Sequence, residues 1–333
     1  LFPYTTLFRS SRMAQFARLI GRRLISLPFM VVGVALLVFI VMSFSNVDPA
    51  RLALGEAASA EALNNYRELH GLNDPLLVRF FSFLGGLFTG DLGTSSGGVP
   101  VTEMVAQAFP RTLELTFLSL IIAVILSFTL GVLAALYRDT FVDQIIRVLS
   151  IASLATPSFW LAILLIQWLG DIPGGWGFFP ALVSGWTSFA DDPQQYLLNM
   201  TLPAIAGAIP VAGSLTRVVR TSMVEELDRD YVRTAIGAGI PYPIVISRNV
   251  LRNALITPVT VLGLRVGYLM GGAVIIEIIF NIQAMGKLIL DGIQRNDVYL
   301  VQGVTLTVAI AFIVINLLVD ILYVLINPRI RSI

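Results

Sequence analysis

The chain of 333 residues contains no cysteine and only one histidine, His70. The absence of cysteine excludes disulfides, thiolate zinc sites, iron–sulfur clusters and a cysteine nucleophile. A single histidine cannot form a multi-histidine metal site within one chain. The net charge of +1 gives no sign of a nucleic-acid partner. We therefore expect no metal, no cofactor and no nucleic acid.

Charged residues are also scarce, at 13% of the chain, while 56% of residues are hydrophobic and the mean hydropathy is +0.83. Soluble domains are usually about 25% charged and about 45–50% apolar. Such a composition indicates an integral membrane protein, provided that the chain contains spans of the right length. A bilayer core needs roughly 20 apolar residues in one helix.

Six apolar runs meet this length requirement. They are residues 24–44, 113–136, 145–169, 197–219, 254–276 and 304–326. We predict an all-α membrane protein with six transmembrane helices in a single domain, residues 13–333. The first residues, LFPYTTLFRS, resemble the translation of a sequencing adaptor, so we exclude residues 1–12 as an adaptor or cloning scar.

Lysine and arginine are distributed unevenly between the two sides of these runs, which predicts orientation. Thirteen lie on one side: Arg18, Arg22, Arg23, Arg138, Arg147, Arg217, Arg220, Arg229, Arg233, Arg248, Arg252, Arg329 and Arg331. Six lie on the other: Arg51, Arg67, Arg79, Arg111, Lys287 and Arg295. Both termini are therefore expected in the cytoplasm. The first run could instead be a signal peptide, but it is long for one and lacks a clear cleavage site.

The outward segment, residues 45–112, is expected to contain a short helix and an apolar stretch. SAEALNNYRELHGL predicts a short amphipathic helix that Ser59 caps and Gly71 ends, with His70 packing or capping at that end. LLVRFFSFLGGLFTGDLG is too short to span and too apolar for open solvent. We expect it at the membrane interface or packed on the spans.

The connection at residues 220–253 contains VEELDRDYVRTAIGAGIPYP, the densest charge cluster in the chain. Ser222 and Glu225 fit a capping box, which predicts a helix from about Met223. Its apolar stripe would be Val224, Leu227, Tyr231, Ala235 and Ala238. Glycines and prolines then predict a sharp bend and a second helix to about Asn253. This bent pair would fit a partner's groove, or it is a basic loop that contacts anionic lipid.

DYVRTAIGAGI and RNVLRNALITPVT resemble the signature loop of inner-membrane permeases of binding-protein-dependent ABC importers. The signature's Glu-Ala-Ala triplet, aligned on Gly239, is here Arg233-Thr234-Ala235, so the acid is absent, as is common in the peptide-type branch. RTLELTF, GGAVIIEIIF, VQGVTL, NLLVDILYVLINPRIR and the outward segment resemble the first permease of dipeptide, oligopeptide and nickel importers. The likeness extends from Met13 to the C-terminus. NIQAMG (281–286) and RNDVYL (295–300) depart from that branch, which leaves the binding protein and substrate class open.

The resemblance implies a type I permease fold in the cell inner membrane that works by alternating access. It implies a second homologous permease, two cytoplasmic ABC ATPases and an extracytoplasmic binding protein, with a peptide, glutathione or a nickel chelate as substrate. The chain lacks a phosphate-binding loop, since MGKL (285–288) has neither the spacing nor the hydroxyl, so ATP hydrolysis would belong to the partner. The implied ATPase-docking residues are Asp230, Tyr231, Val232, Arg233, Thr234, Ala235, Gly239 and Ile240.

Two other classes of membrane protein remain as alternatives. An ion-coupled secondary transporter would need buried carboxylates, and the runs hold few acids: Glu114 and Asp320, with Glu277 just past the end of the fifth run. An intramembrane serine protease would need a Ser–His pair inside the membrane, which the one histidine, in an outward loop, does not supply.

Arg265 lies at the middle of the fifth run, where an arginine costs about 2.5–3.5 kcal/mol on insertion scales. It should therefore face the interior of the assembly or a water path. It would either contact an anionic or carbonyl group of the substrate or bind a structural partner on a neighbouring span.

Overall fold

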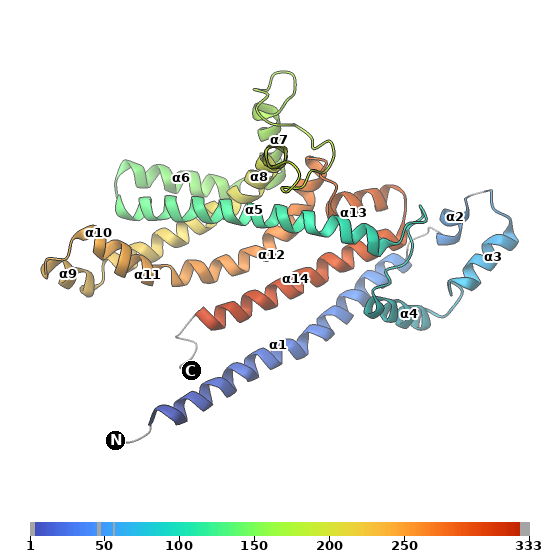
Figure 1. Ribbon diagram of the computed structural model, residues 1–333, viewed down its shortest axis with the longest axis horizontal. Coiled ribbons are helices and arrows are strands. Elements are labelled where there is room, and N and C mark those ends of the chain that lie inside the picture. The colour runs from blue at the N-terminus through green and yellow to red at the C-terminus, as the bar shows by residue number, and fades with distance from the viewer. Residues whose placement is uncertain (1–3, 45–47, 56, 327–333) are drawn as a thin grey trace. The chain divides into compact units, whose positions relative to one another are not determined.

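The computed structural model describes residues 4–44, 48–55 and 57–326, and these ranges contain helices and no strand (Figure 1). Residues 1–3 of the excluded segment, and Arg329 and Arg331, lie outside the described residues. The all-α prediction is confirmed. The described chain forms two compact units, residues 1–112 with 283–317 (unit 1) and residues 113–282 with 318–333 (unit 2).

The helices follow one another along the chain, with a long connection at residues 170–192. They are α1 (Tyr4–Ser43), α2 (Pro49–Leu54), α3 (Ala60–Leu69), α4 (Leu76–Thr89), α5 (Val101–Leu136), α6 (Phe141–Ala155), α7 (Ser158–Leu169), α8 (Pro193–Leu227), α9 (Asp230–Gly237), α10 (Tyr242–Ile244), a π-helix (Val245–Val250), α11 (Leu251–Ala254), α12 (Ile256–Ile279), α13 (Met285–Gln294) and α14 (Val298–Ile326).

Among the described residues, five helical segments are long and apolar enough to cross a membrane, or six if one bent pair counts as a span. They lie in α1, α5, α8, α12 and α14. The third expected run, residues 145–169, is not one helix: α6 and α7 meet at an angle of 107°. Pro157 follows Thr156, which is extended at φ −84° and ψ 120°, and a residue before proline is disfavoured in helical geometry.

Unit 1 confirms the short helix expected in the outward segment and shows the apolar stretch after it as a second helix packed on a span. The Ser59 hydroxyl accepts a hydrogen bond from the Ala62 amide at 3.2 Å, and α3 ends at His70, whose Nδ1 lies 2.9 Å from the Tyr66 carbonyl. The apolar helix α4 packs on α1 through Phe80 and Phe39, whose ring centroids are 5.5 Å apart. The outward segment is therefore attached to a span.

Asp297 ties the loop after α4 to the start of α14 within unit 1. Its Oδ2 accepts from the Ser95 hydroxyl at 2.7 Å and from the Ser96 amide and hydroxyl at 2.7 and 2.9 Å. Its Oδ1 accepts from the Leu300 amide at 3.1 Å, which caps α14. The departing sequence RNDVYL thus supplies a helix cap that also anchors a second loop.

Unit 2 is built around α8, against which α6, α7 and α12 pack (Figure 1). Small residues allow these close approaches, as is usual for helices in membranes. A Cβ added to Gly213 would lie 1.9 Å from the Ser153 hydroxyl oxygen and 2.7 Å from the Ser150 carbonyl oxygen. The face of α8 toward α6 is therefore held by direct contact with the α6 backbone.

Candidate functional site

The connection between α8 and α12 folds as a short helix, a bend and a second helical segment, all in unit 2. The predicted capping box is wrong, because α8 continues unbroken to Leu227 and Ser222 is buried inside it. Instead α9 begins after Arg229, which is extended, and Asp230 places an acid in the first turn, where the helix dipole favours it. The second segment, Tyr242–Ala254, ends within one residue of the expected Asn253.

Gly239 makes the bend between the two segments. Its φ is +80°, a left-handed conformation that side-chain-bearing residues rarely adopt. Pro241 and Pro243 follow, and Pro243 sits in the first turn of α10, where proline is well tolerated. The bend is therefore specified by its sequence rather than by packing from outside.

The inner face of the connection is packed into the bundle. Val232, Val245, Ile246 and Val250 are buried, and they form one cluster with side chains from α5, α8 and α11, which we call the anchoring cluster. Those side chains are Ala135, Val219, Met223 and Ala254. The Tyr231 hydroxyl adds a polar link, since it donates to Glu226 Oε2 at 3.0 Å. The connection is thus fixed to the ends of two long helices.

The outer face carries four large apolar side chains that the rest of the chain leaves exposed, which we call the apolar elbow. These are Ile236, Ile240, Tyr242 and Ile244, exposed by 45%, 40%, 50% and 47%. The helix itself contributes Ile236, and the other three follow the bend at Gly239. Exposed apolar groups gathered in this way mark an interaction site.

The structure divides the predicted docking residues between the two faces. Asp230, Arg233, Thr234, Gly239 and Ile240 are exposed, whereas Val232 is buried and Tyr231 and Ala235 pack partly against the anchoring cluster. The predicted apolar stripe holds for Val224, Leu227, Tyr231 and Ala235, but Ala238 is exposed. Sequence reasoning missed Ile236, Tyr242 and Ile244, because Ile236 lies near the end of α9 and the other two follow the bend, so no single helical period relates them.

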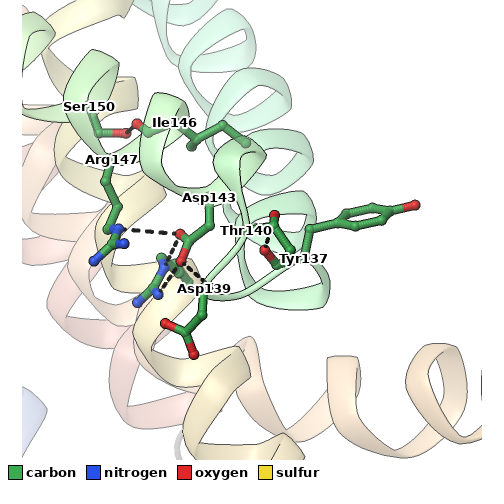
Figure 2. Close-up of polar contacts among 8 residues, drawn as sticks. Tyr137, Asp139, Thr140, Asp143, Ile146, Arg147 and Ser150 are labelled. Carbon is green, nitrogen blue, oxygen red and sulfur yellow. Dashed lines mark hydrogen bonds and ion pairs between the residues drawn. The ribbon is translucent and has the colours of Figure 1, made fainter.

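A buried carboxylate in the first turn of α6, directly after the α5–α6 turn, pairs with an arginine of α8 (Figure 2). Asp143 is fully buried, and Arg220 Nε and Nη2 lie 2.6 and 2.7 Å from its two oxygens. The Asp139 amide donates to Asp143 Oδ2 at 3.1 Å, and Arg147 Nε lies 3.5 Å from Oδ1. The sequence marks Arg147 and Arg220 only as orientation signals, and nothing in their spacing indicates their common partner.

A second ion pair links the α5–α6 turn to Asp228, the residue that directly follows α8. Arg138 Nη1 lies 2.9 and 2.8 Å from the two Asp228 oxygens, and Asp228 caps the end of α8. Both side chains are about half exposed, so this pair contributes less to stability than the buried one. The two pairs together fix the α5–α6 turn to the last turns of α8.

Arg265 has a structural partner within unit 2. Its Nη2 donates to the Ser214 hydroxyl at 2.8 Å, and Ser214 is buried on α8. Arg265 itself is half-buried. A neutral hydroxyl satisfies one of the five guanidinium N–H donors, and none of the ion pairs among the described residues includes Arg265. Within the described residues, no group of three or more acidic or histidine side chains is placed to hold a metal ion.

Comparisons with known proteins match nearly the whole chain. Residues 127–332 match the family described as binding-protein-dependent transport system inner membrane component, and residues 16–116 match the N-terminal family of such membrane components. A probable D,D-dipeptide transport permease of Escherichia coli (strain K12) is 37% identical over 95% of this chain and 98% of its own.

Two further relatives extend the comparison. A putative peptide transport permease of Brucella abortus (strain 2308) is 38% identical over 92% of this chain and 96% of its own. A glutathione transport permease of Salmonella choleraesuis is 36% identical over 93% of this chain and 97% of its own.

Proposed function

Because the chain belongs to the family of binding-protein-dependent transport system inner membrane components, we propose that its apolar elbow docks on a cytoplasmic ATPase subunit. The chain is a multi-span permease subunit of an ABC importer in the inner membrane. Such importers need an ATPase and a substrate-binding partner. The ion-coupled alternative has no support from the comparisons.

The observation that carries the docking proposal is the two-sided character of the connection. Its outer face presents Ile236, Ile240, Tyr242 and Ile244 to solvent, while its inner face is buried against α5 and α8. A partner that moved the outer face would move the ends of these helices with it. We propose that this motion switches the permease between inward-open and outward-open states, and that ATP is bound and hydrolysed by the partner alone.

Arg233 stands where the wider family has an acid, and its side chain is exposed beside the elbow. Docking here would then rest on apolar contact and on a basic group, and not on a carboxylate at that position. The matching ATPase surface would be a groove with an apolar floor and an acidic rim.

The substrate is proposed to be a short peptide or a peptide-like solute such as glutathione. This follows from the relatives named for D,D-dipeptide, peptide and glutathione transport. A second, homologous permease would complete the pathway. Arg265 could contact substrate along that pathway while it also binds Ser214. If it does, Arg265→Gln should lower uptake of at least one candidate substrate in vesicles. Unchanged uptake of all of them would leave Arg265 with a structural role only.

Cysteine crosslinking tests the docking proposal without a background reaction, because the chain has no cysteine. Ile236→Cys or Ile240→Cys should crosslink to a cysteine introduced in the groove of the ATPase. Phe178→Cys is the matched control, since Phe178 is 61% exposed in the connection at the other end of α8. Crosslinking of Phe178→Cys, or none at the elbow in an assembled complex, would contradict the proposal.

A further inference from the structure

A cavity of about 260 Å³ lies within unit 1, where α1, α4 and the start of α14 meet the loops at residues 70–74 and 91–93. We call it the α1–α4 cavity. Its volume is near the lower end of the range for small-molecule sites, about 300–1,000 Å³. It uses none of the residues of the α8–α12 connection, so it is independent of the docking proposal.

Gln302 brings a buried hydrogen-bond donor to this cavity. The residue is only 6% exposed, and within the described residues its Nε2 has no hydrogen-bond partner. A buried amide nitrogen without an acceptor is costly, and most such groups in native proteins have a partner. The NH₂ group can only donate, so a partner for it has to supply an acceptor atom.

Arg79 brings a positive charge to the same cavity. It is half-buried on α4, and its guanidinium carbon lies 6.0 Å from the Phe39 ring centroid. None of the ion pairs among the described residues includes it. A guanidinium forms its strongest hydrogen bonds with a carboxylate, often through two parallel contacts. Arg79 and Gln302 therefore require the same kind of ligand group.

The rest of the lining limits the charge and the body of the ligand. Asp74 and Asp91 also line the cavity, and both are exposed. These carboxylates disfavour a multiply charged anion such as a phosphate ester, because like charges repel at short range. Phe39, Phe83 and Met42 form an apolar wall. The lining therefore fits a singly charged carboxylate attached to an apolar group.

We propose that the α1–α4 cavity is a binding site for a small free carboxylate with an apolar side chain, held between Arg79 and Gln302. Amino-acid and short-peptide C-termini have this chemistry, and the volume fits a molecule of that size. Binding here requires neither the ATPase nor motion of the α8–α12 connection. The site would hold ligand on the permease itself, apart from any site on a binding protein.

Calorimetric titration of the full chain in lipid nanodiscs tests the proposal. The probes are N-acetyl-leucine, which has the carboxylate and the apolar group, and N-acetyl-leucinamide, which is the same molecule without the charge. The acid should bind about tenfold or more tightly than the amide, the usual effect of a charge-assisted hydrogen bond. Equal binding of both probes, or binding of neither, would overturn the proposal.

Two variants and a control assign the binding to the named residues. Arg79→Gln and Gln302→Met should each weaken binding of the acid by about tenfold. Arg295→Gln should leave it unchanged, since Arg295 is exposed and does not line the cavity. Thermal unfolding checks that each variant folds. If Gln302→Met does not fold, the binding of the acid by Arg79→Gln alone tests the proposed contact. Acid binding by folded Arg79→Gln that equals wild type would rule out the proposed contact.

Discussion

Asp143 and Arg220 form a two-point ion pair, with Nε 2.6 Å from Oδ1 and Nη2 2.7 Å from Oδ2. The carboxylate has no exposed surface and the arginine retains 20% of its own. Removal of one partner from a buried pair leaves a charge without compensation, whereas removal of both is much less harmful. The pair therefore determines how firmly the α5–α6 turn holds the end of α8 that leads into the connection.

Asp143→Asn should destabilise the chain by about 3 kcal/mol, the lower end of the range for buried pairs because Arg220 is partly exposed. The double variant Asp143→Leu with Arg220→Leu should recover part of this loss. Asp228→Asn, which breaks the more exposed pair with Arg138, is the matched control and should shift the unfolding temperature less. Thermal unfolding in detergent measures all three, and equal losses from Asp143→Asn and Asp228→Asn would contradict this account.

Ile236→Glu should abolish assembly with the ATPase and transport without lowering the stability of the chain itself. Ile236 is 45% exposed, so a charge there meets water in the free chain and an apolar surface only in the complex. Phe178→Glu changes a comparably exposed apolar residue, at 61%, and should assemble normally. Pull-down of the ATPase and ATP-dependent uptake in vesicles are the measurements. Assembly of the Ile236 variant at the wild-type level would show that the apolar elbow is not the surface that binds the ATPase.

Gly213→Ala should destabilise unit 2 by about 1–3 kcal/mol, the usual cost of overpacking. The new Cβ would lie 2.7 Å from the Ser150 carbonyl oxygen, a backbone atom that cannot rotate away, so α6 and α8 must separate. Gly271→Ala on α12 is the control, because nothing lies within 4 Å of its added Cβ and alanine favours a helix. Chemical unfolding compares the two, and a Gly213 variant as stable as the Gly271 variant would show that the helices are not in close contact.

Thiol labelling in intact cells should confirm the predicted orientation. Phe178→Cys should react with a membrane-impermeant maleimide before lysis, and Arg229→Cys only after lysis. Both positions are exposed, at the two ends of α8. The reverse pattern would invert the orientation that the thirteen-to-six distribution of basic residues predicts.

Acid should loosen the α2–α3 region through Asp48. The hydrogen bond from Arg67 lowers the pKa of this carboxyl, with a smaller contribution from the Ala50 amide and opposition from burial. A lowered folded-state pKa gives stability that is present above the unfolded pKa of about 3.9 and lost as the pH falls through the folded value. Hydrogen exchange, corrected for its intrinsic pH dependence, should therefore show wild-type protection at residues 49–69 falling below about pH 4.

Asp48→Asn is the control for this loss. It should be less protected at neutral pH and show no further fall in acid. Wild-type protection that stays constant through this pH range would show that the Arg67 contact does not stabilise the region.

Long apolar runs predicted the spans because burial in a bilayer constrains length and composition directly. The helix at residues 60–69 was also predictable, since Ser59 and Gly71 act within a few residues of the helix ends that they define. The break between α6 and α7 was not predicted, although Thr156-Pro157 is a local signal, because proline is tolerated inside spans such as α8.

The location of the candidate site in the sequence was predictable, but which of its side chains face inward was only partly so. The bend at Gly239 and the two prolines could be found by inspection, because these residues restrict their own backbone. Which side of α9 faces inward depended on Ala135, Val219 and Met223, which lie far away in the sequence. For the same reason Val232 was assigned to docking although it is buried, and the partner of Arg220 was not found.

Because of the π-helix at Val245–Val250, the number of residues in the connection controls how the apolar elbow is oriented relative to α12. Its backbone bonds reach one residue further than in an α-helix, so it accommodates one extra residue per turn. Loss of a single residue there would let the segment relax to an ordinary α-helix while the chain before it kept its direction relative to α12, because the π turn already absorbs one residue. Loss of a second residue would rotate everything before it by about 100° relative to α12. That rotation would turn the apolar elbow away from its partner while every remaining side chain kept its chemistry.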